Sequence, residues 1–205
     1  MSSEGRLFVI SGSSGSGKGT VLKELLKMSD KFCYSVSATT REPREGEKNG
    51  VNYFFVSREQ FEAYIKSGDM LEYAEYCGNL YGTPKTFVID MQKKGKNVLL
   101  EIEVCGAMQI KSKIPGAIMI FITPPTYNEL KTRLYERGTE NSDIIEARLR
   151  EAVNEIKAAK EYDYIILNKK GKAKVAAENI ISILHGSFDN YMDKTKIINN
   201  FLNNV

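Results

Sequence analysis

A glycine- and serine-rich segment with one lysine is the part of the chain whose residue types most clearly suggest chemistry. It runs from Gly12 to Lys18 and reads Gly-Ser-Ser-Gly-Ser-Gly-Lys. Glycines allow a tight turn in which backbone N–H groups hold phosphate oxygens, and a lysine adds a positive charge. The P-loop pattern has Ser or Thr directly after the lysine, whereas here Gly19 separates Lys18 from Thr20. This departure affects magnesium ligation rather than phosphate binding, so the segment predicts a nucleoside triphosphate site.

Three arginines form a second candidate group. Arg133 and Arg137 share one face of an expected helix, and Arg148 lies near the start of the next helix. Arginines can neutralise a transferring phosphoryl group, so we expect these three to close over bound phosphates from the loop that they flank. The alternative is a solvated helix face on which Glu129 pairs with Arg133 as a surface salt bridge.

A third group suggests a second phosphate site. Arg41 and Arg44 lie three positions apart in a turn-rich segment, a spacing that suits two arginines holding one phosphate. Tyr53 and Tyr81 could each donate a phenolic hydrogen bond to the same group, although a tyrosine in a strand more often only packs. A second phosphate site beside the first predicts a nucleotide acceptor.

Alternating strand and helix patterns must position these residues. An apolar run at 7–10 predicts a buried strand before the glycine segment, and a run at helical spacing follows it. Further strands are expected at 97–103, 117–122 and 162–168, so the fold class is α/β with a mostly parallel sheet flanked by helices. Glu101 and Glu103 stand at alternate positions and are expected on one side of their strand.

The chain is expected to divide into four parts. Residues 1–36, 84–136 and 149–185 form the P-loop core, 37–83 a β-rich lobe, 137–148 a helical lid, and 186–205 a loosely amphipathic tail.

Composition indicates an ordinary globular protein. The 205 residues are 42% hydrophobic and 27% charged, with a net charge of +3, which does not predict a nucleic-acid partner. No apolar run is long enough for a membrane span, and the N-terminus lacks a signal peptide, so a cytoplasmic location without membrane partners is expected. Cys33, Cys77 and Cys105 have no C-x-x-C spacing and are expected to be reduced thiols. The single histidine, His185, is expected to be solvated.

The order and spacing of these motifs closely resemble those of the guanylate kinases. The resemblance spans most of the chain, from Leu7 to Asn168. It is carried by Gly12–Thr20, Ser35–Glu47, Asn49 and Gly50 with Tyr53, Glu72–Ala74, Gly78–Thr83, Glu101–Glu103 with Gly106, and Arg137–Thr139. It implies a P-loop kinase that transfers the γ-phosphoryl group of ATP to GMP, giving ADP and GDP, with Mg²⁺. Use of dGMP and the oligomeric state are left open, and a homodimer is compatible with the sequence.

Further roles are expected for individual residues in catalysis, in Mg²⁺ binding and in the ATP site. Lys18, Arg41, Arg133, Arg137 and Arg148 would be catalytic. Thr20 and Glu101 would hold Mg²⁺, directly or through water. The ATP site would comprise Ser13, Ser14, Gly15, Ser16, Gly17, Lys18, Gly19, Thr20 and Asn168.

On the acceptor side, residues 37–83 would form the GMP-binding lobe. Glu72 suits guanine because a carboxylate can accept from both N1–H and the 2-amino group, which adenine lacks. The strand pattern alone does not distinguish Glu72 from Glu75, and the resemblance selects Glu72. Arg41, Arg44, Tyr53 and Tyr81 would hold the phosphate, Ser37, Glu72 and Thr83 would read the base, and Glu103 would lie near the base or the metal-bound waters.

The chain departs from the family pattern at three places: Gly19, the glutamates Glu101 and Glu103 where some relatives have aspartates, and Lys169-Lys170, which follow Asn168 where an acidic residue is common. Two other functions remain as alternatives. One is a non-catalytic guanylate-kinase-like domain that binds proteins, which would not need Lys18 or the lid arginines. The other is a nucleoside monophosphate kinase of different base specificity.

Overall fold

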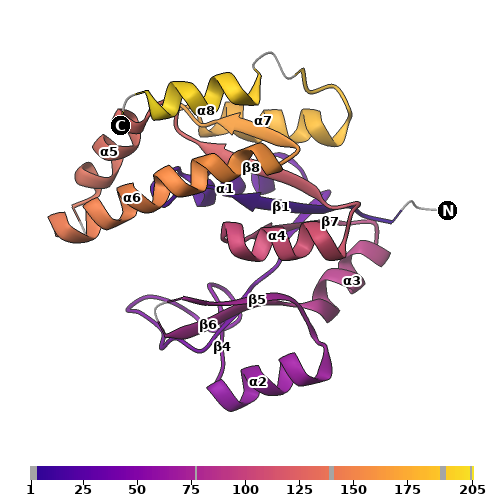
Figure 1. Cartoon of the computed structure of the whole chain (residues 1–205). Coiled ribbons are helices and arrows are strands. Elements are labelled where there is room, and N and C mark those ends of the chain that lie inside the picture. Colours follow the sequence, from indigo (N-terminus) through magenta and orange to yellow (C-terminus); the bar gives the residue numbers. More distant parts are fainter. Residues whose placement is uncertain (1–3, 77, 139–140, 190–192, 204) are drawn as a thin grey trace. The chain divides into compact units, whose positions relative to one another are not determined.

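Hydrogen-bonded strands form two sheets in the computed structural model of the chain (Figure 1), which describes residues 4–76, 78–138, 141–189, 193–203 and 205. The first sheet has the strand order β2-β7-β1-β8-β9, with β2 parallel to β7 and β8 parallel to β9. The second has the order β4-β3-β6-β5. The expected α/β class with a parallel, helix-flanked sheet is confirmed. Contacts divide the chain into two compact units, one of Met1–Val9 and Lys31–Ile118 and the other of Ile10–Asp30 and Met119–Val205.

The first unit contains the four-stranded sheet. Strand β1 (Leu7–Ser11) begins in this unit and ends in the second. The remaining elements of the first unit are β2 (Phe32–Tyr34), β3 (Ala38–Thr39), β4 (Phe54–Phe55), α2 (Arg58–Ser67), β5 (Met70–Tyr76), β6 (Asn79–Pro84), α3 (Lys85–Lys93), β7 (Asn97–Glu101) and α4 (Val104–Lys113).

Helix α2 covers one face of the four-stranded sheet (Figure 1) because both contribute apolar side chains to one small core. Ala38, Phe61 and Leu80 are all buried there. The helix begins at a capping box formed by Ser57 and Gln60 and ends at Gly68, whose φ of 72° favours glycine. The opposite face of the sheet is therefore left for polar side chains.

The second unit contains the glycine segment. Its first helix, α1, begins at the last residue of the glycine segment and buries Val21, Leu22 and Leu25. The elements of this unit are α1 (Lys18–Met28), β8 (Ile118–Thr123), which begins in the first unit, α5 (Tyr127–Arg137), α6 (Ser142–Ala158), a 3₁₀ turn (Ala159–Glu161), β9 (Tyr164–Leu167), α7 (Ala173–Leu184) and α8 (Lys194–Leu202).

Three elements differ from what the sequence predicted. The strand expected at 97–103 ends at Glu101, and Glu103 immediately precedes α4, so the two carboxylates do not alternate along one strand. Helix α4 gave no strong pattern because Gly106 interrupts its short apolar stripe. The tail contains a regular helix, α8, which buries Ile197 and Phe201 four positions apart.

Other expectations concern single residues and boundaries. Cys33 and Cys105 are free thiols, and His185 is exposed at the end of α7. Cys77 and residues 139 and 140 of the expected lid lie outside the described residues. Within the described residues, no helix has both the length and the apolar character needed to cross a membrane. The division into core, lobe, lid and tail remains a prediction.

Candidate active site

Strand β1 leads into a loop whose shape depends on glycine. Gly12, Gly15 and Gly17 have φ values of 148°, 84° and 85°, which L side chains rarely adopt. Neighbouring atoms also leave no room for a side chain at Gly17, where a Cβ would lie 2.5 Å from the Asn168 amide nitrogen. The Gly17 carbonyl accepts from the N–H groups of Thr20 and Val21, both at 3.1 Å, so the loop ends at the positive end of α1. This is the geometry expected of a phosphate-binding loop.

Lys18 lies over this loop. Its Nζ donates to the backbone carbonyls of Gly12 and of Ser13, the second at 3.3 Å. Both acceptors belong to the loop itself, so the ammonium group lies at the loop.

The Ser16 carbonyl is held by two side chains that are distant in sequence. Asn168 donates through Nδ2 at 2.8 Å and Arg133 through Nη1 at 3.2 Å. Arg133 also donates through Nη2 to the Asn168 carbonyl at 2.6 Å and to the Glu129 carboxylate. The pair of Glu129 and Arg133 considered from the sequence is therefore present, and Arg133 anchors the loop. A direct role for Arg133 in phosphoryl transfer remains a prediction.

The two other lid arginines differ in their surroundings. Arg148 on α6 donates through Nη1 to the Ser14 hydroxyl, which brings it to the phosphate loop. Arg137 is the exposed last residue of α5, directly before Gly138, whose φ of 63° ends the helix. The structure thus places Arg133, Arg148 and Asn168 at the loop, and Arg137 one helical turn from Arg133.

Four of the acceptor residues predicted from the sequence lie on the sheet face opposite the one that packs against α2. Tyr81 and Thr83 alternate along β6 and so point to the same face. Glu72 on β5 pairs directly with Thr83. Extending the antiparallel pairing of β3 and β6 by one residue places Ser37 opposite Thr83 as well. Four predicted side chains, from β5, from β6 and from the residue that precedes β3, therefore share one face.

Arg41 is the centre of a cluster on this unit. Its guanidinium carbon lies 5.5 Å from the ring centroid of Tyr53 and 5.8 Å from that of Phe55. Both Glu47 carboxylate oxygens accept from its Nη2, at 3.0 and 2.9 Å. The rings of Tyr53 and Tyr81 meet edge to face at 6.0 Å. The cluster combines a fixed cation with two phenols, as a phosphate site requires.

Glu47 also binds the segment that carries Arg44. Its carboxylate accepts from the Arg44 backbone N–H at 2.7 Å, and this bond, followed by its contact with Arg41, lowers the pKa of Glu47. The Arg44 side chain is exposed. Burial raises the pKa of Tyr53, which keeps its hydroxyl protonated as a donor.

The Glu72 carboxylate, predicted to read the base, is buried. The residue is 4% exposed, and Oε1 accepts from the Thr83 hydroxyl at 2.7 Å. Burial raises the pKa of Glu72, while the hydrogen bond from Thr83 and the charge of Lys113 oppose the shift. Glu75 is exposed and pairs with Arg58 at 3.5 Å, so the structure supports Glu72 as the candidate base-reading residue.

The predicted metal ligands are an exposed hydroxyl and a half-buried carboxylate. Thr20 is exposed in the first turn of α1, and Glu101 accepts a hydrogen bond from the Tyr34 hydroxyl, whose pKa is raised by burial and by that carboxylate. Glu103 is exposed, and its carbonyl caps α4 by accepting from Ala107 at 3.0 Å. The described residues contain no cluster of three or more His, Cys, Asp or Glu suited to a metal. Such donors fit Mg²⁺, which commonly binds through one or two protein oxygens together with substrate phosphates.

Sequence reasoning assigned no role to Glu47, Phe55 and Tyr34. The position of Glu47, shortly after Arg41 and Arg44, could have predicted its ion pair with Arg41, because oppositely charged residues close together in a turn can pair. No local pattern pointed to Tyr34, because its partner Glu101 is on a different strand.

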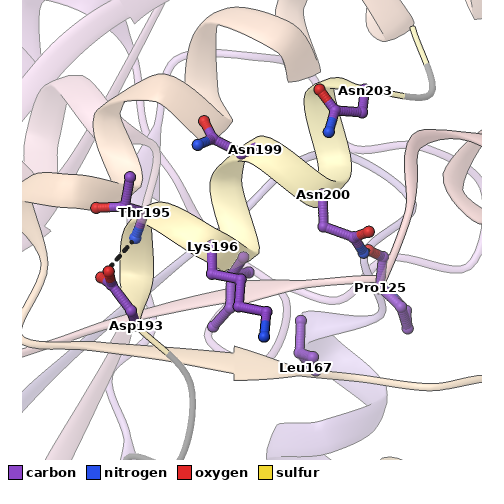
Figure 2. A pocket seen from close by; sticks show the side chains of 9 residues that line it. Pro125, Leu167, Asp193, Thr195, Lys196, Asn199, Asn200 and Asn203 are labelled. Carbon is purple, nitrogen blue, oxygen red and sulfur yellow. Dashed lines mark hydrogen bonds between the residues drawn. The ribbon is translucent and has the colours of Figure 1, made fainter.

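A pocket of about 630 Å³ lies along α8 (Figure 2). Its lining includes Pro125 and Leu167, and the Asn200 amide points to Pro125, whose carbonyl accepts from Nδ2 at 3.1 Å. None of the residues predicted to bind substrate lines this pocket.

Comparison with known proteins gives a consistent assignment. A family model described as guanylate kinase matches residues 4–182. Guanylate kinases of Streptococcus agalactiae serotype III (strain NEM316) and Streptococcus pyogenes serotype M3 (strain SSI-1) are each 51% identical over 185 residues, which is 90% of this chain and 88% and 87% of theirs. The crystal structure of guanylate kinase from Anaplasma phagocytophilum aligns with a TM-score of 0.73 and 35% identity over 92% of this chain and 89% of that chain. The chain therefore belongs to the guanylate kinase family.

Proposed function

We propose that this protein transfers the γ-phosphoryl group of ATP to GMP, giving ADP and GDP. The observation that carries the proposal is the buried Glu72–Thr83 pair on the same sheet face as Tyr81. Glu72 supplies acceptors for the two donors on the edge of guanine, and Tyr81 belongs to the Arg41 cluster that suits the phosphate of the same nucleotide. Adenine has neither donor in the corresponding positions and would leave the buried carboxylate unpaired.

In the acceptor half, the Arg41 cluster aims the GMP phosphate. Glu47 and the two flanking rings hold the guanidinium in one orientation before substrate binds. Because little side-chain freedom is then lost on binding, more of the interaction energy goes into orienting the attacking oxygen. Arg44, being exposed, is available as a second cation for the same phosphate.

In the donor half, the phosphate loop and Lys18 bind the triphosphate tail of ATP. The anchoring of the Ser16 carbonyl by Asn168 and Arg133 keeps the loop open around the phosphates. The buried Asn168 Oδ1 has no hydrogen-bond partner within the described residues, and Asn168 is the residue that we assign to the adenine side of ATP. Arg137 and Arg148 then stabilise the charge on the transferring group, since phosphoryl transfer relies on positioning and charge neutralisation.

Thr20 and Glu101 would each be a candidate protein oxygen for Mg²⁺, directly or through water, and the bound ion would neutralise part of the charge on the phosphates. Thr20→Ala is expected to raise the Mg²⁺ concentration for half-maximal rate by about tenfold, because outer-shell partners typically contribute factors of that order. Thr20→Ser retains the hydroxyl and should titrate like the wild type. Identical Mg²⁺ titrations of the alanine variant and the wild type would exclude Thr20 from metal binding.

The activity is tested by coupled ADP release with ATP and each of GMP, dGMP, AMP, UMP and TMP. GMP is expected to have the highest kcat/KM. The comparison of GMP with dGMP shows whether the enzyme recognises the 2′-hydroxyl of the sugar. Faster turnover with AMP than with GMP would overturn the base assignment. No turnover with any acceptor would favour the non-catalytic protein-binding alternative.

The cellular role follows from the reaction. We place the enzyme in purine nucleotide metabolism in the cytoplasm, with ATP and GMP as its binding partners.

A further inference from the structure

Helix α4 lies against β5, the strand that carries Glu72 (Figure 1). Strand β5 is at the edge of its sheet, so alternate backbone groups have no neighbouring strand to bond. The side chain of Gln109 on α4 bonds the backbone groups of Tyr73. Its Nε2 donates to the Tyr73 carbonyl at 2.7 Å, and its Oε1 accepts from the Tyr73 N–H at 3.4 Å. Lys113 donates through Nζ to the Leu71 carbonyl at 3.1 Å. The residues on both sides of Glu72 are thus tied to one helix.

Gly106 is on the same face of α4, three positions before Gln109. It is buried, and the nearest atoms to a Cβ placed there are all from Glu72: the carboxylate Oε2, Cδ at 3.0 Å and Cγ at 3.6 Å. The φ of Gly106 is not positive, so its backbone would accept alanine. Glycine is needed at this position because a side chain would overlap Glu72, and not because the backbone adopts a conformation that only glycine favours.

This arrangement fixes the Glu72 carboxylate from two sides. Thr83 holds Oε1, and the first turn of α4 lies against Oε2. The positive end of a helix favours a nearby ionised carboxylate, which partly offsets the desolvation of a buried acid. The lone pairs that Thr83 does not use stay available for a base.

We propose that α4 is a positioning element for guanine selection, in which Gly106 leaves the space that the Glu72 carboxylate occupies and Gln109 fixes the strand that carries it. The proposal rests on the function proposed above. Gly106 does not touch the substrate, so it acts only through Glu72. Glycine is less favourable than alanine inside a helix, and its presence in α4 is explained where a side chain would displace the Glu72 carboxylate.

Gly106→Ala is expected to weaken GMP binding by about 10- to 100-fold, because a displacement of roughly 1 Å at a site that needs exact alignment has effects of this size. The measurement is the Kd of GMP by calorimetry, together with KM for GMP, KM for ATP and kcat at saturating GMP. The ATP constants should stay within twofold. Gly116→Ala is the matched control, since nothing lies within 4 Å of a Cβ there.

A double-mutant cycle separates displacement of Glu72 from a general loss of structure. Glu72→Asp shortens the acidic side chain by one methylene and leaves room for a Cβ at 106. In that background Gly106→Ala should weaken GMP binding less than threefold further. Equal effects of Gly106→Ala in both backgrounds would overturn the proposal, as would unchanged GMP binding in Gly106→Ala.

Gln109→Met provides an independent test if Gly106→Ala does not fold. It removes both bonds to Tyr73 and should also raise the Kd of GMP with little effect on KM for ATP. Wild-type affinity for GMP in this variant would contradict a positioning role for α4. Failure of the proposed function itself would be distinguishable, because the wild-type enzyme would then show no turnover with GMP.

Discussion

Arg137→Ala is expected to lower kcat by about 10³- to 10⁵-fold, or roughly 4 to 7 kcal/mol of transition-state stabilisation. Arg137 is exposed at the end of α5, beside the loop expected to close over the phosphates. An arginine that meets the transferring group only during reaction contributes to kcat and little to substrate binding. The KM values for ATP and GMP should therefore change by less than threefold. Steady-state kinetics with both substrates varied gives these constants.

Two variants control this prediction. Arg137→Lys keeps the charge but loses the planar fork, so its kcat should lie between those of the wild type and the alanine variant. Arg150→Ala removes another exposed arginine, from α6, and should stay within twofold of wild type. Turnover of Arg137→Ala within tenfold of the wild-type value would show that Arg137 does not stabilise the transition state.

Glu72→Gln is expected to lower kcat/KM for GMP by about 10³- to 10⁴-fold, near the range seen when a polar recognition site and its ligand no longer match. The substitution keeps the shape of the side chain but turns one acceptor into a donor that faces the donors of guanine. The KM for ATP should not change. A variant that still prefers GMP over AMP by the wild-type factor would remove Glu72 from base recognition.

Because Glu72 is titratable, we expect GMP binding to depend on pH. Burial raises the pKa of Glu72 above its ordinary value of 4.5, although the hydrogen bond from Thr83 and the charge of Lys113 act in the opposite direction. As pH falls through this raised pKa, the carboxylate is protonated and GMP binding weakens, at a higher pH than an exposed glutamate would give. The phosphate of GMP also takes up a proton in this range, because the second pKa of a phosphate monoester is about 6. The pH profile of Glu72→Gln isolates that contribution, and the difference between the two profiles belongs to Glu72.

Linkage determines the effect on stability. A carboxyl group with a raised pKa in the folded state contributes stability at pH values below its unfolded pKa, and this contribution is lost as pH rises through the folded pKa. At pH values above the folded pKa the wild-type protein carries a charged, buried acid, so there Glu72→Gln should melt at the same or a higher temperature. A large drop in melting temperature would mean that the loss of activity reflects unfolding.

The features that the sequence by itself determined depend on residues close together in the chain. The strand, glycine loop, lysine and helix of the phosphate loop follow one another from β1 to α1, and the loop forms as expected. The ends of α2 also depend on local residues, the capping box at Ser57 and the positive φ of Gly68. Family motifs in fixed order indicated a guanylate kinase before any side-chain position was known.

The tertiary structure alone decided which distant groups meet. Arg133 reaches the Ser16 carbonyl across 117 positions, which made it an anchor of the loop as well as a candidate lid cation. The pairing of β5 with β6 places Glu72, and not Glu75, opposite Thr83. Helix α4, unrecognised in the sequence, placed Gly106 beside the Glu72 carboxylate. Such contacts leave no periodic pattern in the sequence, because they depend on how packed elements bring side chains together and not on the spacing along any one element.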